Sequence, residues 1–303
     1  MAVADVSVVV VSYNTREHLE RCLASIAGRH EVIVVDNGST DGSRELVRAR
    51  FPAVRLLEPG ENRGFGAANN AGMEVASGRY FLLQNADAWP VGDAVDRLVA
   101  FADVNPRAGV VGPRLLNPDG TLQRSVRGFP TRWRIATEYF FLRKLAPRSR
   151  AVNAFYGAGF DHRSVREADF LMGAVLLLRR EAVDEVGGFD ESFFMFSEEV
   201  DLCYRMRKGG WSIVFYPGAE FVHVGGASTR LEWGRMYREQ LRGHLRFLAK
   251  HEGLERAEHT RRLLMAALRL RAVAFRGERG RTYREAGRWL ASGDAKALLQ
   301  SPE

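Results

Sequence analysis

The first 90 residues alternate apolar β-branched runs with segments of helical spacing, and this alternation constrains the fold more than any other feature. Residues 5–14 (DVSVVVVSYN) and 31–40 (EVIVVDNGST) contain continuous β-branched runs, as expected of strands buried on both faces. Between them Leu19, Leu23 and Ile26 recur at the spacing of one helix face. Strands and helices that alternate in this way predict an α/β domain with a mostly parallel sheet.

Length and composition are those of a globular protein. The chain has 303 residues, of which 46% are hydrophobic and 27% charged, enough for one large domain with an appendage or for two small domains. Its two cysteines, Cys22 and Cys203, cannot form a disulfide framework, which favours a reducing, cytoplasmic compartment. The N-terminus lacks a basic region before its short apolar run, so we expect no signal peptide, and we expect no membrane span.

The excess positive charge is confined to the last quarter of the chain. Residues 231–303 contain 16 Lys and Arg against 9 Asp and Glu, whereas residues 1–230 contain 28 of each sign. The sequence therefore predicts a neutral domain over residues 1–230 and a basic helical extension over residues 231–303. A neutral body argues against a nucleic-acid-binding face on the main domain, and we expect no nucleic acid partner.

Polar side chains follow the apolar runs at the points where three predicted strands end. These residues are Ser12, Tyr13, Asp36, Asn37, Asn85 and Asp87. In open α/β sheets, ligands bind at the carboxyl ends of the strands. The sequence therefore predicts a ligand site at this edge.

Four residues carry specific candidate roles, and each has a structural alternative. Asp87 is a suitable oxygen ligand for Mg²⁺ or Mn²⁺, or else a turn aspartate. His223, before a glycine pair, is a suitable Mn²⁺ ligand, or else a core or capping histidine. Asp36 can accept hydrogen bonds from a ribose or a pyrimidine base, or else close an Asx turn. Arg63, beside glycines, can meet a phosphate.

The middle of the chain has a looser pattern. Residues 124–150 form a basic, aromatic-rich segment that fits an acceptor-binding or lid region as well as plain surface loops. Residues 211–226 (WSIVFYPGAEFVHVGG) predict a pair of strands that ends at His223.

Three acids lie within four residues at Glu198, Glu199 and Asp201, after a segment rich in Gly and Phe. They precede a predicted helix that turns Leu202, Cys203 and Met206 inward, so they lie at its N-terminal end, where the helix dipole favours carboxylates. One interpretation is that the acids only stabilise the N-terminus of the helix. The other is a site that removes a proton from a substrate hydroxyl.

Together these segments resemble glycosyltransferase family 2. The resemblance rests on SVVVVSYN, VIVVDNGSTDGS, NRGFGAANNAG, NADA, FLMGAVLLLRREAVDEVGGFDESFFMFSEEVDLCYR and HVGGAST, and it covers about residues 5–230 in order. Within the family the chain is most similar to bacterial rhamnosyltransferases that act on polyprenyl-diphosphate-linked sugars in cell-wall or surface polysaccharide synthesis. The resemblance implies a GT-A fold (Rossmann-like) and inverting transfer from a nucleotide-sugar with a divalent metal, Mg²⁺ or Mn²⁺.

The resemblance also implies roles for individual residues. Glu199 falls at the position of the catalytic base, and Asp87 with His223 would hold the metal on the donor diphosphate. Asp36 would contact the nucleotide base. The other donor-binding candidates are Ser12, Tyr13, Asn37, Arg63 and Asn85, and the acceptor or supporting candidates are Glu198, Asp201 and Arg205.

Two departures from the family pattern stand out. The chain has Asn85-Ala86-Asp87 where many relatives have Asp-x-Asp, which leaves a single carboxylate for the metal. It also has Glu199 where the base is usually Asp, one methylene shorter.

The expected partners follow from the resemblance. The donor is expected to be dTDP-L-rhamnose and the acceptor a lipid-linked sugar. The alternatives are a hexosyltransferase that uses a UDP-sugar and a non-catalytic sugar-nucleotide-binding protein on this fold.

The basic extension carries Arg and Lys interleaved with Leu, Phe and Met at helical spacing. Such helices can lie on an anionic membrane surface, which predicts a cytoplasmic protein held peripherally at the inner face of the cell membrane. They can equally pack on the main domain or form a homodimer interface.

Overall fold

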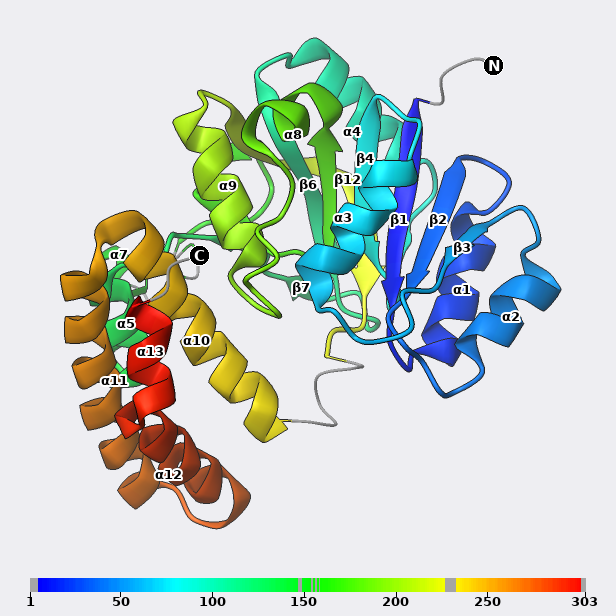
Figure 1. The fold of residues 1–303 in the computed structure, drawn as a ribbon. Helices are drawn as coiled ribbons and strands as arrows, with labels where there is room; N and C mark the ends of the chain where they lie inside the picture. Colours follow the sequence, from blue (N-terminus) through cyan, green and yellow to red (C-terminus); the bar gives the residue numbers. More distant parts are fainter. Residues whose placement is uncertain are drawn as a thin grey trace.

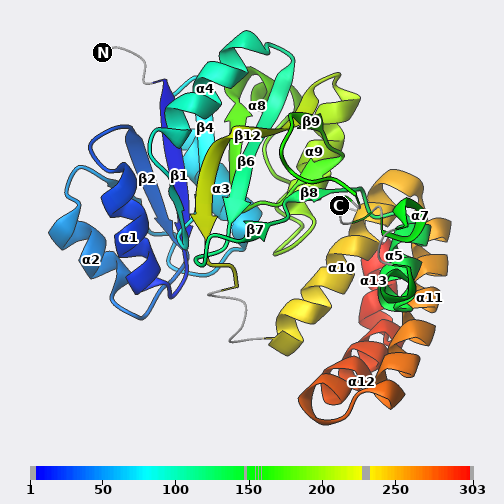
Figure 2. The same ribbon diagram turned by 180° about the vertical axis from the view of Figure 1, so that it is seen from behind.

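The computed structural model describes residues 5–146, 149–153, 155, 157, 159–226 and 233–300. A twisted sheet carries helices on both faces, and a group of helices from the C-terminal part of the chain lies to one side (Figures 1 and 2). The predicted boundary near residue 230 and the end of the HVGGAST motif fall outside the described residues.

The main sheet confirms the prediction of a mostly parallel arrangement. Its strands, in order across the sheet, are β3 (Arg55–Leu57), β2 (Glu31–Asp36), β1 (Val6–Ser12), β4 (Tyr80–Asn85), β11 (Val175–Arg179), β6 (Ala108–Leu116), β12 (Ser212–His223) and β5 (Ala88–Pro90). Of the pairs along this order, β11 runs antiparallel to its neighbours β4 and β6, and β5 runs antiparallel to β12. Short strands complete it: β7 (Leu122–Gln123), β9 (Arg166–Glu167), and the separate pair β8 (Val126–Arg127) and β10 (Phe170–Leu171).

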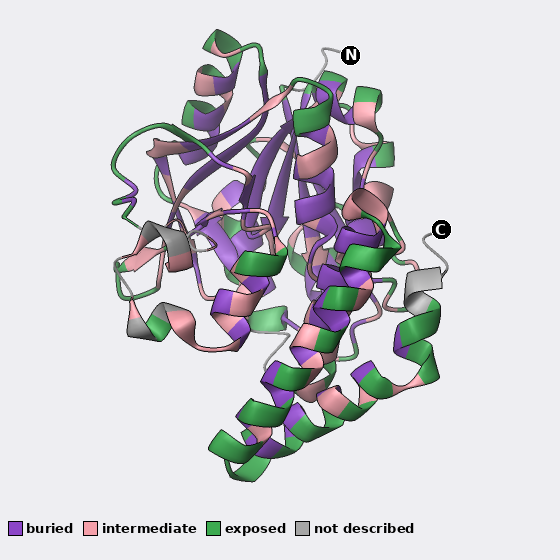
Figure 3. Ribbon diagram, turned by 90° about the vertical axis from the view of Figure 1, so that its left-hand side faces the viewer, coloured by how far each residue is buried: buried purple, intermediate pink, exposed green. Residues whose placement is uncertain are grey.

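The β-branched runs are buried from both sides, which explains their composition. In β1, Val8 and Val10 pack with α1 (Arg16–Ile26) and α4 (Ala94–Val104), whereas Val9 packs with the opposite layer. That opposite layer contains α3 (Phe65–Val75), α8 (Arg180–Val186) and α9 (Glu198–Lys208), while α2 (Ser43–Arg50) joins the first layer through Val47. Figure 3 shows the strands as the most buried part of the molecule. Successive side chains point to opposite faces of a strand, so neither face of the run can be polar.

The predicted pair of strands over residues 211–226 is wrong. The structure has one strand, β12, which pairs with β6 on both sides of a register shift between Tyr216 and Glu220. Pro217 and Gly218 lie in that shift, where a bulge leaves backbone groups out of the ladder and a proline is tolerated.

The C-terminal segment forms α10 (Trp233–Glu252), α11 (Leu254–Ala274), α12 (Gly277–Ala291) and α13 (Gly293–Gln300). The basic middle segment contributes α5 (Arg132–Tyr139), α6 (Leu142–Leu145) and α7 (Arg150–Asn153), and α5 packs on α11. The apolar faces of α10 and α11 belong to the same core as α9 and the sheet. Packing on the main domain therefore accounts for most of their apolar spacing, although Leu270 and Val273 stay exposed. Among the described helices, none has the length and apolar character needed to cross a membrane.

Both cysteines are free and buried, Cys22 in α1 and Cys203 in α9. Burial raises the pKa of each thiol to about 12. These side chains pack as small apolar groups.

Candidate active site

The carboxyl ends of the central strands meet at one edge of the sheet, as predicted. Ser12 at the end of β1 is in register with Asp36 at the end of β2, and Val11 is in register with Asn85 at the end of β4. A cavity of about 480 Å³ opens at this edge. Its lining includes Tyr13, Asn37, Asn62, Asn85, Asp87, Gln123, Phe194, Met195, Phe196, Glu198, Glu199, His223, Arg235 and Met236.

Asp87 and His223 come together in this cavity because β5, which begins at Ala88, pairs with the end of β12. The His223 Nε2 atom lies 3.2 Å from Asp87 Oδ1, and both residues are buried. Burial alone would raise the pKa of Asp87, but the contact with His223 and the hydrogen bond from the Gly225 N–H to Oδ2 (3.0 Å) together lower it. Asp87 is therefore held as a carboxylate.

Gln123 fixes the ring of His223. The Gln123 side-chain NH₂ donates to the backbone oxygen of His223 (3.2 Å) and to Asn117 Oδ1 (3.0 Å), so its Oε1 atom faces His223 Nδ1 at 2.6 Å. An oxygen acceptor requires the proton on Nδ1. In the neutral ring, Nε2 then presents its lone pair towards Asp87.

His223 Nε2 lies 3.2 Å from Asp87 Oδ1 and 3.4 Å from Asn85 Nδ2, and a proton or a cation between Nε2 and the carboxylate stabilises this contact. An imidazole nitrogen and one carboxylate suit a divalent metal such as Mn²⁺ or Mg²⁺. The described residues contain no group of three or more His, Cys, Asp or Glu side chains that could bind a metal alone. A metal here would need further ligands from water or from a bound molecule.

Glu198 and Glu199 begin α9 and also line the cavity. Burial raises the pKa of Glu199 to about 7, although nearby backbone N–H groups lower it in part. Burial and the neighbouring Glu199 carboxylate raise the pKa of Glu198 well above its usual range. The Oε2 atom of each has no hydrogen-bond partner among the described residues. The pair therefore offers a proton acceptor that is poised near neutrality and has a buried oxygen without a partner in the described structure.

Asp201 is turned away from this cavity and is completely buried. Its carboxylate contacts Arg205 (2.7 Å), Lys250 (2.8 Å) and His251 (2.7 Å). Burial alone would raise the pKa of Asp201, but these partners lower it to about 2. Arg205 also donates to the backbone oxygens of Val186 and Gly188 (both 2.7 Å) at the end of α8. The structure thus places Asp201 and Arg205 in a supporting network between helices.

The donor-binding candidates divide into those that line the cavity and those behind it. Tyr13, Asn37 and Asn85 are in its lining. Ser12 is buried behind it, with its hydroxyl 3.2 Å from that of Thr15. Arg63 lies outside the lining and pairs with Glu191 at 3.3 Å.

Asp36 lies behind the cavity wall. Its Oδ1 accepts from the Ser39 N–H (2.8 Å), as in an Asx turn, while the buried Oδ2 has no partner in the described structure. Asn37 accepts from the Arg63 N–H and donates to Asn62 and to the Gly64 oxygen, which fixes the loop that precedes α3. One free Asp36 oxygen beside this loop is consistent with contact to a nucleotide.

The sequence prediction missed several lining residues. Gln123 is in the loosely patterned middle segment, and no spacing signal singled it out. Arg235 and Met236 come from α10, which we expected to belong to a separate extension. Phe194, Met195 and Phe196 precede the acid cluster, and their bulky apolar character beside acids was the available signal.

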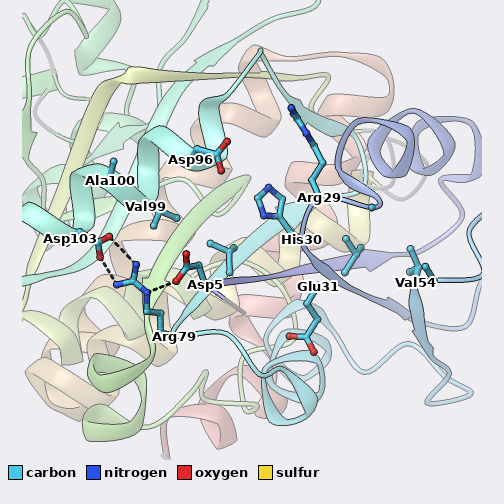
Figure 4. A pocket seen from close by; sticks show the side chains of 14 residues that line it. Asp5, Arg29, His30, Glu31, Val54, Arg79, Asp96, Val99, Ala100 and Asp103 are labelled. Atoms are coloured by element: carbon cyan, nitrogen blue, oxygen red, sulfur yellow. Dashed lines mark hydrogen bonds and ion pairs between the residues drawn. The ribbon is translucent and has the colours of Figure 1, made fainter. Parts of the chain in front are cut away.

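A second cavity, of about 640 Å³, lies at the opposite edge of the sheet, where β1 and β2 begin (Figure 4). Its lining includes Asp5, His30, Glu31, Asp96 and Asp103 together with Arg29 and Arg79. Arg79 donates to Asp5 (2.9 Å) and to both oxygens of Asp103 (2.6 and 2.9 Å). None of the residues predicted for catalysis or donor binding lies in this lining.

Comparison with known proteins gives consistent results. The model of the family described as "Glycosyl transferase family 2" matches residues 7–186. The N-acetylglucosaminyl-diphospho-decaprenol L-rhamnosyltransferase of Mycobacterium tuberculosis is 37% identical over 271 residues, which cover 82% of this chain and 86% of that protein. The low-salt glycan biosynthesis hexosyltransferase Agl10 of Haloferax volcanii is 23% identical over 84% of this chain and 80% of its own length.

Solved structures show the same fold. The mannosyltransferase PcManGT of Pyrobaculum calidifontis, in complex with GDP-Man and Mn²⁺, has a TM-score of 0.55 and 18% identity over 99% of this chain and 86% of its own. GalNAc-T7 with UDP, GalNAc and Mn²⁺ has a TM-score of 0.58 and 14% identity, over 99% of this chain and 58% of that chain. At these identities the likeness concerns the fold.

Proposed function

The chain belongs to glycosyltransferase family 2, and from this premise we propose that it transfers L-rhamnose from dTDP-L-rhamnose to N-acetylglucosamine linked through diphosphate to a polyprenol. The carrying observation is that Glu199 and the Asp87–His223 pair line the same cavity. The choice of sugars is supported by the 37% identity to the mycobacterial rhamnosyltransferase over most of both chains.

Glu199 is proposed as the general base. As the acceptor hydroxyl oxygen attacks the anomeric carbon, its proton passes to the Glu199 carboxylate, and the bond from that carbon to the diphosphate oxygen breaks with the electron pair on the nucleotide. Attack from the face opposite the leaving group inverts the anomeric centre. A base with a pKa of about 7 is matched to proton transfer near neutral pH.

Asp87 and His223 are proposed to hold a divalent metal, Mg²⁺ or Mn²⁺, against the donor diphosphate. When bound, the metal neutralises the charge that grows on the leaving nucleotide. Gln123 keeps His223 Nε2 turned towards Asp87, a supporting role typical of residues behind a metal ligand. Tyr13, Asn37 and Asn85 would contact the donor directly. Asp36 would contact the pyrimidine base of the nucleotide.

The helices α10 to α13 are proposed to bring this cavity to an anionic membrane surface, where a lipid-linked acceptor resides. The charge of residues 231–303 supports this, since each basic residue near the headgroups contributes roughly 1 kcal/mol. We propose accordingly that the protein works at the inner face of the cell membrane.

The test is a transfer assay with the full chain, Mg²⁺ or Mn²⁺, and a short polyprenyl-diphosphate N-acetylglucosamine acceptor in detergent. We expect rhamnosylated product with dTDP-L-rhamnose and little with UDP-hexoses. Product with a UDP-hexose and none with dTDP-L-rhamnose would indicate a hexosyltransferase instead. The similarity to Agl10 supports this alternative. Nucleotide-sugar binding without transfer to any acceptor would favour a non-catalytic role.

A further inference from the structure

The chain adopts an unusual conformation immediately before the two glutamates. Phe196 and Ser197 both have positive φ angles, of 67° and 73°, although neither is a glycine. A left-handed conformation costs a residue with a Cβ atom roughly 1–2 kcal/mol, so two in succession persist only where the surroundings hold them. This turn determines how α9 starts and where Glu199 points.

The turn also affects the charge of the carboxylate. The backbone N–H groups of Ser197, Glu199 and Val200 lower the pKa of Glu199 against the effect of burial. A change in the Ser197 backbone would therefore alter both the position and the pKa of the proposed base.

Helix α10 packs directly on this turn at Gly243. A Cβ atom at Gly243 would lie 2.5 Å from the Phe196 backbone oxygen and 2.7 Å from Ser197 Oγ. Both distances are shorter than any ordinary non-bonded contact, and the Phe196 oxygen is backbone, which cannot turn aside as a side chain can. Only a residue without a side chain lets the helix approach so closely.

The same face of α10 continues the contact. Arg246 donates to the Ser192 oxygen (2.5 Å), and Lys250 lies 2.7 Å from Asp190 and 2.8 Å from Asp201. Positions 243, 246 and 250 share one helix face. Residues 190–197 are thus held by α10 at both ends, and α9 is held at Asp201. Figure 1 shows the upper part of α10 close to α9.

We propose that α10 is the positioning element for the catalytic carboxylate: Gly243 admits the left-handed turn at Phe196–Ser197, and Lys250 anchors its two flanks. The inference rests on the proposed role of Glu199 as base. It also means that α10, although in the basic extension, is part of the catalytic unit.

The first test compares two glycines of the same helix. Gly243→Ala is expected to lower kcat by about 10- to 100-fold, because a base displaced by an ångström reacts far more slowly. The donor KM should stay within about twofold, since Asn37 and Asp87 follow strands of the sheet and do not belong to the turn that Gly243 contacts. Gly234→Ala is the control: among the described residues, its Cβ would meet only Thr282 Oγ1, at 4.0 Å, so kcat should not change.

A second pair of variants tests the positioning role of α10 even if Gly243→Ala does not fold. Lys250→Gln removes the anchor at a partly exposed side chain and should lower kcat several-fold with the donor KM unchanged, while Lys250→Arg restores kcat. An unchanged kcat in Lys250→Gln would overturn the inference, as would a loss in Gly234→Ala equal to that in Gly243→Ala.

The wild-type protein separates this inference from the proposed function. If it transfers no sugar, or if Glu199→Gln remains fully active, the proposed function or the base assignment fails. If wild-type transfers sugar through Glu199 and the α10 variants do so equally well, only the positioning role fails.

Discussion

The two cavities lie at opposite edges of one sheet and are both lined by charged side chains, but their charges are used differently. At the edge where β1 and β2 begin, Arg79 pairs with Asp5 and Asp103. At the edge where the strands end, Glu198 and Glu199 each retain a buried oxygen without a partner among the described residues. At the first edge these three charges are paired with one another, whereas at the second the two carboxyl groups keep an oxygen for a ligand. The difference in pairing, and not the presence of charge, distinguishes the two cavities.

The sharpest test of this contrast is Glu199→Gln, which keeps the shape and removes the proton acceptor. We expect kcat to fall by about 10³-fold, within the range that general base catalysis contributes. Because the base works only when deprotonated, wild-type kcat should fall as the pH drops through about 7. Glu199→Asp, as the matched control, should keep this acid limb at a lower rate; a wild-type rate independent of pH from 6 to 8 would argue against Glu199.

The next largest effect concerns a third acid of the same helix turn, whose charge is fully paired. Asp201→Asn should lower the free energy of unfolding by about 3 kcal/mol, since it leaves Arg205, Lys250 and His251 without their shared partner. The folded-state pKa of Asp201 is lowered to about 2 from an ordinary value of 3.8. Its contribution is therefore present above pH 4 and lost as the pH falls towards 2. Denaturant unfolding at pH 7 and pH 3 should show a smaller difference between variant and wild type at pH 3.

Gln123→Met tests the support of the proposed metal site. Without the acceptor at Nδ1, the orientation of His223 is no longer fixed, and metal affinity or activity should fall by about 10- to 100-fold. Titration of kcat with Mn²⁺ would show the loss as a higher half-saturating concentration, largely recovered at high metal. An unchanged half-saturating Mn²⁺ concentration would show that Gln123 does not support a metal ligand at His223.

The smallest effect is expected at the opposite edge. Arg79→Gln removes the ion pairs of the cavity at this edge, but these groups are largely exposed, and such pairs contribute about 0.2–1 kcal/mol. Transfer activity should stay at the wild-type level in the same assay. A pronounced loss of kcat would show that this edge takes part in function after all and would remove the contrast between the cavities.

Sequence reasoning predicted the sheet because its signal is local. Val8, Val9, Val10 and Val11 form an unbroken apolar run, so only burial on both faces suits them, and the strand ends follow directly. Asp87 and His223 could also be named as candidates in advance, although 136 residues apart, because each follows an apolar run. Their contact was not predictable from spacing, since it depends on β5 turning back to pair with β12.

The supporting residues had no such local signal. Gln123 belongs to a two-residue strand, and its role depends on Asn117 and His223 from elsewhere in the chain. Asp201 looked equivalent to Glu198 and Glu199 in sequence, and only the approach of Lys250 and His251 from α10 distinguishes it. The left-handed turn at Phe196 and Ser197 contradicts local preference, so tertiary contacts alone can reveal it.

The two buried thiols give the chain a practical property. Cys22 and Cys203 are inaccessible, and with pKa values of about 12 they carry almost no thiolate at neutral pH. A maleimide should therefore label the native protein only when it opens, so the labelling rate reports the opening of two separate regions, α1 and α9. A cysteine introduced at an exposed position such as Val273 would then take up a fluorophore selectively, without removal of the native thiols.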